Sequence, residues 1–153
     1  MAEDTTKVRI VVLTYDAEAY IEGCLGSLRG IRTDGLDVGV IVVDNASSDR
    51  TVEMIREQHA WVTLVESAEN RGFAGGNNIG IERAIAEGAE YVYLLNQDTV
   101  VDPDFLVQAV KVGEADERIG SVQSLLLLES ERERINSTGN AQAQDTTRDP
   151  IRH

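Results

Sequence analysis

The sequence predicts an α/β domain built on a mostly parallel sheet with helices on both faces. Between Val8 and Leu127, short β-branched runs alternate with segments whose apolar residues recur at helical spacing. Such alternation is typical of parallel strands that are joined by crossover helices. The chain has 153 residues, of which 42% are hydrophobic and 27% charged, and this is enough for one domain with its own core.

The expected elements follow one another in a regular order. Each strand is predicted from an apolar run of strand length, and each helix from apolar residues three or four positions apart. Strands are expected at Val8–Thr14, Val38–Asp44, Trp61–Val65, Tyr91–Leu95 and Ile119–Leu127, and helices at Ala17–Arg29, Asp49–His59, Gly76–Glu87 and Pro103–Glu114. Gly88 follows the third helix, where glycine commonly ends a helix. Asp102 is a good N-cap for the fourth, and proline is tolerated in its first turn.

After Leu128 the sequence becomes polar and loses clear periodicity. A short hairpin strand is expected at Ile135–Gly139, and no regular structure is expected beyond it. The domain is therefore predicted to span residues 1–139, with an irregular or disordered tail at 140–153.

Composition excludes several classes of partner. The formal net charge is −13 and no basic cluster interrupts it, which argues against nucleic-acid binding. The chain has no apolar run of membrane-spanning length and no secretory signal at its start, so no transmembrane segment is expected. The only cysteine, Cys24, excludes an internal disulfide and suits a reducing compartment. Its helical spacing with Tyr20, Ile21, Leu25 and Leu28 indicates a core residue rather than a nucleophile.

Polar residues concentrate directly after the predicted strands. In a parallel sheet the carboxyl ends of all strands share one edge, and ligands bind there in open α/β sheets. The residues concerned are Thr14, Tyr15, Asp16, Asp44, Asn45, Glu66, Ser67, Asn70, Arg71, Asn96 and Asp98. Any one of them could instead simply cap a turn or a helix, but the set as a whole favours a polar ligand lying across this edge.

Three segments define the ligand further. In VIVVDNASSDRT, Asp44 ends a strand and can accept hydrogen bonds from a base or ribose, whereas Ser47, Ser48 and Asp49 are interpreted as caps of the next helix. In ENRGFAGGNNIG, a Gly-rich turn entering a helix could present backbone N–H groups and Arg71 to phosphates. That turn lacks the dinucleotide fingerprint, and close helix–strand packing explains its glycines equally well.

The third segment, YVYLLNQDTVVDPDFL, places Asn96 and Asp98 in a short turn after a buried strand. A carboxylate and a nearby amide offer the oxygen ligands that a hard divalent cation such as Mg²⁺ or Mn²⁺ prefers. The turn is therefore a candidate metal site, with Asp98 as the expected ligand.

These segments, together with VVLTYDAEAYIEGCLGSL, resemble glycosyltransferase family 2 in order and spacing. The nearest resemblance is to its rhamnosyltransferase-like branch, which IGSVQSLLLLESERERINSTGNA also resembles. The resemblance implies a GT-A fold and a nucleotide-diphospho-sugar donor, with inversion of the transferred sugar and a glycan or lipid-linked acceptor. It implies that Thr14 and Tyr15 flank the base and that Asp44 contacts base or ribose. Arg71 and Asn77 would lie near the diphosphate.

The sequence departs from the family in two places. Asn96 stands where the metal motif usually has its first acid, a substitution common in the branch that the chain resembles. The acceptor-side half that carries the catalytic base in the family has no counterpart in residues 140–153, and neither Asp145 nor Asp149 is assigned that role. We therefore expect a truncated, donor-binding half that self-associates or works with a separate acceptor-side half. Its expected location is the cytoplasm, including peripherally at the inner membrane face.

Two alternatives stay open. One is a binding module that holds a nucleotide sugar without turnover. The other is a phosphoacceptor receiver domain with Asp16 and Asp44 as its acidic cluster, but this class needs a lysine after the last strand, and Leu125–Glu131 contains none.

Overall fold

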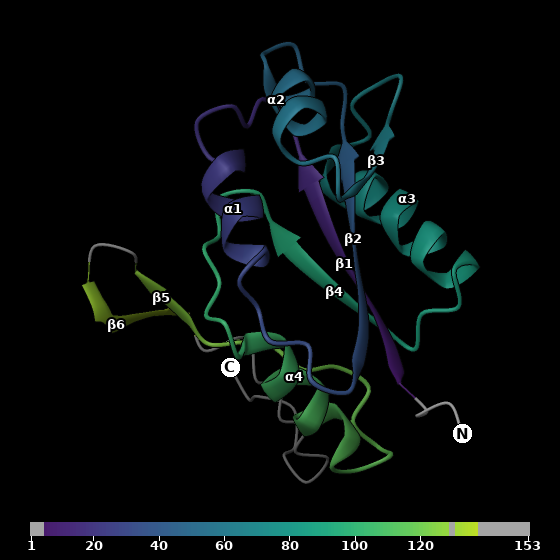
Figure 1. Ribbon diagram of the computed structural model, residues 1–153, viewed down its shortest axis with the longest axis vertical. Helices are drawn as coiled ribbons and strands as arrows, with labels where there is room; N and C mark the ends of the chain where they lie inside the picture. The colour runs from purple at the N-terminus through teal and green to yellow at the C-terminus, as the bar shows by residue number, and fades with distance from the viewer. Residues whose placement is uncertain (1–4, 129–130, 138–153) are drawn as a thin grey trace, which may run out of the picture. The chain divides into compact units, whose positions relative to one another are not determined.

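The computed structural model describes residues 5–128 and 131–137, with side chains for 5–128. These residues fall into two compact units, divided between Lys111 and Val112. The first unit contains a four-stranded sheet of β1 (Thr6–Thr14), β2 (Leu36–Asp44), β3 (Thr63–Glu66) and β4 (Tyr91–Asn96). The order is β3-β2-β1-β4 and every pairing is parallel, as Figure 1 shows. The predicted parallel α/β architecture is confirmed.

The register of the sheet aligns the carboxyl ends of its strands. Thr14 pairs with Asp44, Asp44 pairs with Glu66, and Leu13 pairs with Asn96. The polar residues that follow these strands therefore emerge along one edge.

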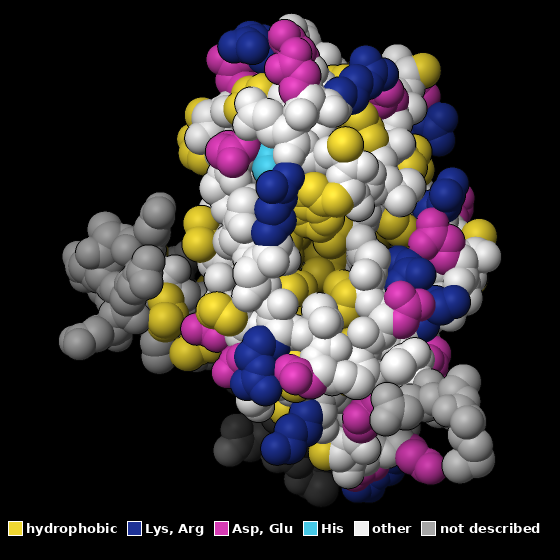
Figure 2. All heavy atoms as spheres, in the orientation of Figure 1, with side chains coloured by type: hydrophobic (Ala, Val, Ile, Leu, Met, Phe, Trp, Pro, Cys, Tyr) yellow, Lys and Arg dark blue, Asp and Glu magenta, His cyan; other side chains and the backbone are white. Residues whose placement is uncertain are grey.

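Helices cover both faces of the sheet, because alternate residues of β1 point to opposite sides. Val8, Ile10 and Val12 are fully buried in a cluster that includes residues of α1 (Ile21–Leu28), α2 (Thr51–Gln58) and α4 (Phe105–Glu114). Val11 belongs to a second cluster on the other face, with Ala84 of α3 (Gly72–Ala86). Figure 2 shows hydrophobic side chains in a hollow over the middle of the first face.

Two glycines bring α3 close to the sheet. A Cβ built on Gly76 would collide with Leu13, and one built on Gly80 would collide with Val11. The helix begins at Gly72, whose φ of +69° suits glycine. The prediction of a Gly-rich turn ahead of a helix starting at Gly76 is therefore wrong. The alternative explanation, close helix–strand packing, is confirmed for Gly76 and Gly80.

Gly80→Ala is expected to lower the free energy of unfolding by about 1–3 kcal/mol, because the added methyl overpacks the contact with Val11. The matched control is Gly26→Ala in α1, where a Cβ meets only ordinary contact. That change should stabilise the protein by up to about 1 kcal/mol through helix propensity. Urea denaturation followed by circular dichroism measures both, and a stabilising Gly80→Ala would contradict the packing argument.

Other helix boundaries differ from the prediction by a few residues. Helix α1 begins at Ile21 rather than Ala17, and α2 begins at Thr51 rather than Asp49. The residues ahead of both helices instead form loops that bond to each other, as described below.

The second unit contains a hairpin of β5 (Leu126–Leu128) and β6 (Glu131–Ser137), which pair antiparallel. The predicted strand at Ile119–Leu127 is wrong except at its end, because residues 119–125 form no strand. Antiparallel strands can be joined by a short link. Leu126–Leu128 therefore pairs with Glu131–Ser137, which follows it closely in sequence. Of the predicted hairpin strand, Thr138 and Gly139 lie outside the described residues, as does the predicted tail.

Candidate functional site

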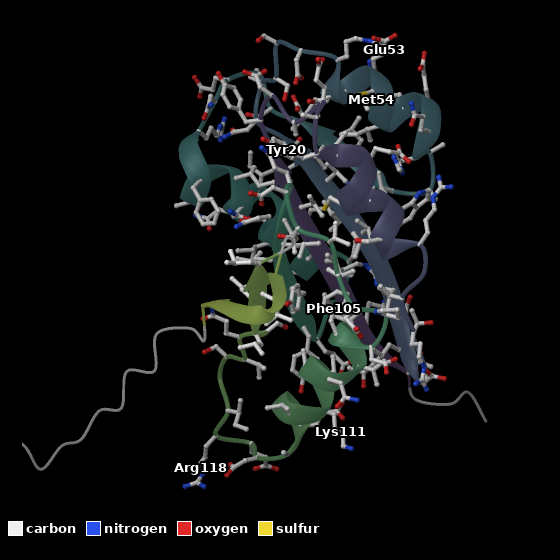
Figure 3. All side chains as sticks on the ribbon, turned by 90° about the vertical axis from the view of Figure 1, so that its left-hand side faces the viewer. Tyr20, Glu53, Met54, Phe105, Lys111 and Arg118 are labelled. Carbon is white, nitrogen blue, oxygen red and sulfur yellow. The ribbon has the colours of Figure 1, made fainter. Side chains whose placement is uncertain are left out.

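Two loops, residues 15–20 after β1 and 45–50 after β2, are tied together by hydrogen bonds from backbone to side chain. The Ala17 N–H donates to Thr51 Oγ1 at 2.7 Å, and the Glu18 N–H donates to Asp49 Oδ2 at 3.0 Å. In the other direction, the Ser48 N–H donates to Asp16 Oδ1 at 2.7 Å. Figure 3 shows the oxygen and nitrogen atoms gathered at this end of the sheet, near Tyr20. These bonds hold the two loops against each other.

Asp44 lies at the centre of this edge and is 3% exposed. Its Oδ1 accepts from the Ser47 hydroxyl at 2.5 Å and from the Thr14 hydroxyl at 3.2 Å, and its Oδ2 accepts from the Ser47 N–H at 3.0 Å. A carboxylate offers about four acceptor positions, so Oδ2 retains one for a further donor. We call Asp44, Thr14 and Ser47 the Asp44 cradle.

Of the three residues that were predicted to cap α2, only one bonds to the start of the helix. Asp49 accepts from the N–H of Thr51, the first residue of α2, at 2.9 Å, but the N-cap residue of this helix is Arg50, which makes no side-chain cap bond. Ser47 does not cap the helix: it bonds to Asp44 instead, and its Oγ accepts from the Asp16 N–H at 3.0 Å. Ser48 bonds to Asp16 rather than to the helix.

Asn45 and Asn70 link the loop after β2 to the start of α3. The Asn45 amide donates to Asn70 Oδ1 at 2.9 Å, and Asn45 Oδ1 accepts from the Arg71 N–H at 2.9 Å. Asn70 Oδ1 also accepts from the Gly72 N–H at 2.9 Å. The oxygens of both side chains are thus engaged in shaping the helix entry.

Arg71 and Asn77 differ in how accessible their side chains are. The Arg71 guanidinium is about half exposed and has a loose ion pair with Glu69 at 3.7 Å. Asn77 is 4% exposed, and its amide donates to the Phe73 carbonyl at 2.9 Å. Of the two side chains, Arg71 is the one accessible to a ligand. Asn77 could contact a ligand only through its second amide proton or its oxygen.

The turn after β4 carries the candidate metal ligand. The Thr99 N–H donates to the Asn96 carbonyl at 3.2 Å and closes the turn, while the side chains of Asn96 and Asp98 are exposed. Among the described residues, no hydrogen-bond donor reaches the Asp98 carboxylate, and no three acidic, His or Cys side chains cluster as a metal site. Asp98 therefore suits a cation for which the protein supplies one carboxylate, while the ligand and water supply the other oxygens.

Cys24 lies beneath this turn and is fully buried, with its Sγ 3.7 Å from the Asn96 carbonyl oxygen. Burial raises the pKa of its thiol to about 12, which confirms a core residue rather than a nucleophile. The free energy of unfolding should therefore fall as the pH rises above 9.0 toward 12, because only the unfolded thiol ionises in that range.

The thiol should also resist alkylation in the folded protein. We expect its reaction with a thiol reagent at pH 8 to be at least about a hundredfold slower than in guanidinium, since the thiolate is the reactive form. A stopped-flow or absorbance assay measures both rates, and equal rates would contradict the buried position.

Sequence reasoning missed the side chain of Gln97, which bonds to both backbone groups of Tyr15. It also missed Ser47 as a member of the Asp44 cradle. A hydroxyl three residues after a strand-end acid was the only available signal for Ser47, and nothing in the sequence indicated the partner of Gln97.

This fold, with its polar edge and its exposed acidic turn, is that of a GT-A-like nucleotide-sugar domain. The model of the family described as glycosyl transferase family 2 matches residues 9–149, so the chain belongs to glycosyltransferase family 2.

Individual relatives agree with this assignment. A mannosyltransferase from Pyrobaculum calidifontis, PcManGT, solved in complex with GDP-Man and Mn²⁺, is 31% identical; the match covers 81% of this chain and 36% of that one, with a TM-score of 0.66. S. aureus TarS 1–349, in complex with UDP-GlcNAc, is 23% identical over 83% of this chain and 42% of its own, with a TM-score of 0.60, and shows the fold alone.

A curated relative is the poly-beta-1,6-N-acetyl-D-glucosamine synthase of Staphylococcus aureus strain COL, which is 28% identical over 118 residues. That match covers 75% of this chain and 27% of the synthase. The chain spans between 16% and 30% of the length of the first three curated relatives it matches. Within residues 5–128 and 131–137, no helix has both the length and the apolar character to cross a bilayer.

Proposed function

We propose that this chain binds the nucleotide-diphospho-sugar donor and its metal ion in an inverting sugar transfer. The observation that carries the proposal is the meeting of the Asp44 cradle and the Asp98 turn at one edge of the sheet, since the register aligns the ends of β2, β1 and β4. A nucleotide base needs a hydrogen-bond acceptor such as Asp44, and a diphosphate needs a cation site such as the Asp98 turn. A nucleoside diphosphate is a ligand that combines both parts.

Each part of the donor has a matching group. Tyr15, which is 46% exposed, flanks the base with the fully buried Thr14 behind it, and Asp44 accepts the imino N–H of the base through the free position on Oδ2. Asp16, Asn45 and Asn70 hold the loops around the nucleotide. Arg71 and Asn77, with the first turn of α3, lie toward the diphosphate, where helix N–H groups favour negative charge.

Mg²⁺ or Mn²⁺ held by Asp98 would neutralise charge on the departing diphosphate. Asn96, as a neutral amide, orders a water molecule or a sugar hydroxyl beside it. The Mn²⁺ in the PcManGT complex and the unengaged Asp98 carboxylate support this assignment.

The donor is a UDP- or dTDP-sugar, and resemblance to the rhamnosyltransferase-like branch favours dTDP-rhamnose. The structures of relatives with UDP-GlcNAc and with GDP-Man make these two donors the necessary comparisons. The acceptor is a glycan or lipid-linked glycan, a proposal that the polysaccharide synthase among the relatives supports.

Transfer also needs a base that deprotonates the acceptor hydroxyl, and general bases contribute typically 10²–10⁴-fold. Among residues 5–128 we identify no acid placed over an acceptor, and Asp145 and Asp149 lie outside the described residues. Residues 1–139 are accordingly proposed as a donor-binding domain, with 140–153 as a tail. It acts in the cytoplasm, or peripherally at the inner membrane face, through self-association or with an acceptor-side partner.

The 153-residue chain is expected to bind UDP or dTDP with Mn²⁺ but to transfer no sugar to an acceptor. Isothermal titration against UDP, dTDP, GDP and ADP measures binding. Nucleoside diphosphate release from UDP-GlcNAc, GDP-Man and dTDP-rhamnose, with and without glycan acceptors, measures turnover. Absence of binding to every nucleotide would contradict the proposed function.

The second candidate is a nucleotide-sugar-binding module without turnover, favoured by the same lack of a placed base. Acceptor-dependent turnover by the monomeric chain would exclude it and would assign the base to residues of this chain.

A further inference from the structure

Gln97 spans from the turn after β4 to the loop after β1. Its Oε1 accepts from the Tyr15 N–H at 2.8 Å, and its Nε2 donates to the Tyr15 carbonyl at 3.2 Å. One side chain thus satisfies both backbone groups of one residue, much as a neighbouring strand would. Only an amide of this length fits the task, because glutamate cannot donate and asparagine is one methylene shorter.

Both ends of this link adjoin groups of the proposed donor site. Gln97 is bonded covalently to Asp98, the proposed metal ligand. Tyr15 stands between Thr14, whose hydroxyl donates to Asp44, and Asp16, whose N–H donates to Ser47. Beyond the β1–β4 ladder, which ends where Leu13 pairs with Asn96, the Asp98 turn and the Asp44 cradle are therefore joined through the side chain of a single residue.

This link has no parallel in the described part of the chain. Between the loop at residues 15–20 and the turn at 96–99, the two bonds of Gln97 are the only side-chain hydrogen bonds among residues 5–128. The turn is also anchored to α1, but by the long contact of the Cys24 Sγ with the Asn96 carbonyl. Removal of the Gln97 amide would leave the loop and the turn in place, each held by its own bonds, but would loosen their spacing.

We propose that Gln97 is a positioning residue that fixes the distance between the nucleotide cradle and the metal turn, so that one donor engages both at once. The inference rests on the proposed function. A ligand that touches both parts gains from their being held in register beforehand, because it does not have to order them on binding. A ligand that touches only one part gains nothing from the link.

The test compares Gln97→Met with its matched control Gln108→Met, an exposed glutamine of α4. Methionine keeps the length of the side chain and removes both hydrogen bonds without adding charge. Titration calorimetry measures uridine, UDP, and UDP with Mn²⁺. We expect Gln97→Met to weaken UDP with Mn²⁺ by roughly five- to tenfold, about the worth of one or two neutral hydrogen bonds, and to change uridine binding by less than about twofold.

Amide hydrogen exchange provides a readout without ligand. The Tyr15 amide should exchange about tenfold faster in Gln97→Met, since it loses its acceptor, while the Asp16 amide, bonded to Ser47, should keep its rate. Gln108→Met should leave both amides and all three affinities unchanged.

Three results separate the possibilities. If the wild-type chain binds no nucleotide, the proposed function and this inference both fail. If it binds UDP with Mn²⁺ and Gln97→Met binds equally tightly, only the positioning role fails. An equal loss of affinity for uridine and for UDP with Mn²⁺ would also overturn it, because Gln97 would then act on the base alone.

Discussion

Asp98→Ala should abolish the strengthening of nucleoside diphosphate binding by Mn²⁺. In the wild-type chain the exposed carboxylate, which no described donor engages, is free to share a cation with the diphosphate. The variant loses the only protein carboxylate in the turn, so UDP should bind with nearly the same affinity with and without the metal. Titration calorimetry in the presence of Mn²⁺ and of chelator measures the ratio.

The control must separate metal binding from the loss of one negative charge. Glu57→Ala changes the net charge equally. Glu57 is exposed on α2, and its side chain makes no hydrogen bond or ion pair with any of residues 5–128. This variant should keep the full enhancement by Mn²⁺. An enhancement in Asp98→Ala equal to that of the wild type would refute the assignment of Asp98.

Asp44→Ala should weaken binding of the preferred nucleotide by roughly tenfold to a hundredfold, the worth of one hydrogen bond to a charged group, about 1.5–3 kcal/mol. UDP, dTDP and GDP should all be affected, because uracil, thymine and guanine carry an imino N–H that can donate to this carboxylate. ADP should bind weakly to both proteins, since adenine has an acceptor at the corresponding ring nitrogen.

The same change should also lower stability, because it leaves both Ser47 donors without their acceptor and leaves the Thr14 hydroxyl with only the Val43 carbonyl at 3.4 Å. We expect a loss of about 2–3 kcal/mol in the free energy of unfolding. Affinity is therefore measured well below the transition temperature. Asp37→Ala, at the opposite end of β2, is the control: its ion pair with Arg9 is long, at 3.6 Å, and Arg9 keeps its closer partner Glu87 at 2.7 Å, so the loss should be small. Unchanged affinity in a folded Asp44→Ala would exclude the contact with the base.

The sequence predicted the sheet well because its two central strands, β1 and β2, are largely buried on both faces and read as apolar runs. It did not predict that α3 starts at Gly72, since glycines are poor helix formers and the contacts with Leu13 and Val11 that favour them come from the sheet. The leucine run that forms β5 was assigned to the parallel sheet because a short apolar run does not specify its partner.

The candidate site was predictable to the level of residue types at strand ends. Parallel register alone brings Thr14, Asp44 and Asn96 to one edge, and alternation of strands and helices implies that register. Which side chains bond to one another along this edge was not predictable. Gln97 meets Tyr15 across 82 positions of sequence, and a turn residue gives no periodic signal of where its side chain points.

The seating of α3 on Gly76 and Gly80 restricts how the helix can move. Because the helix backbone rests directly on Leu13 and Val11, the helix cannot slide along the sheet without losing that fit. The distance from the N–H groups of its first turn to the strand ends is therefore held constant. In the proposed function, the two glycines would thus support the nucleotide site indirectly, by keeping the start of the helix in place without touching the ligand.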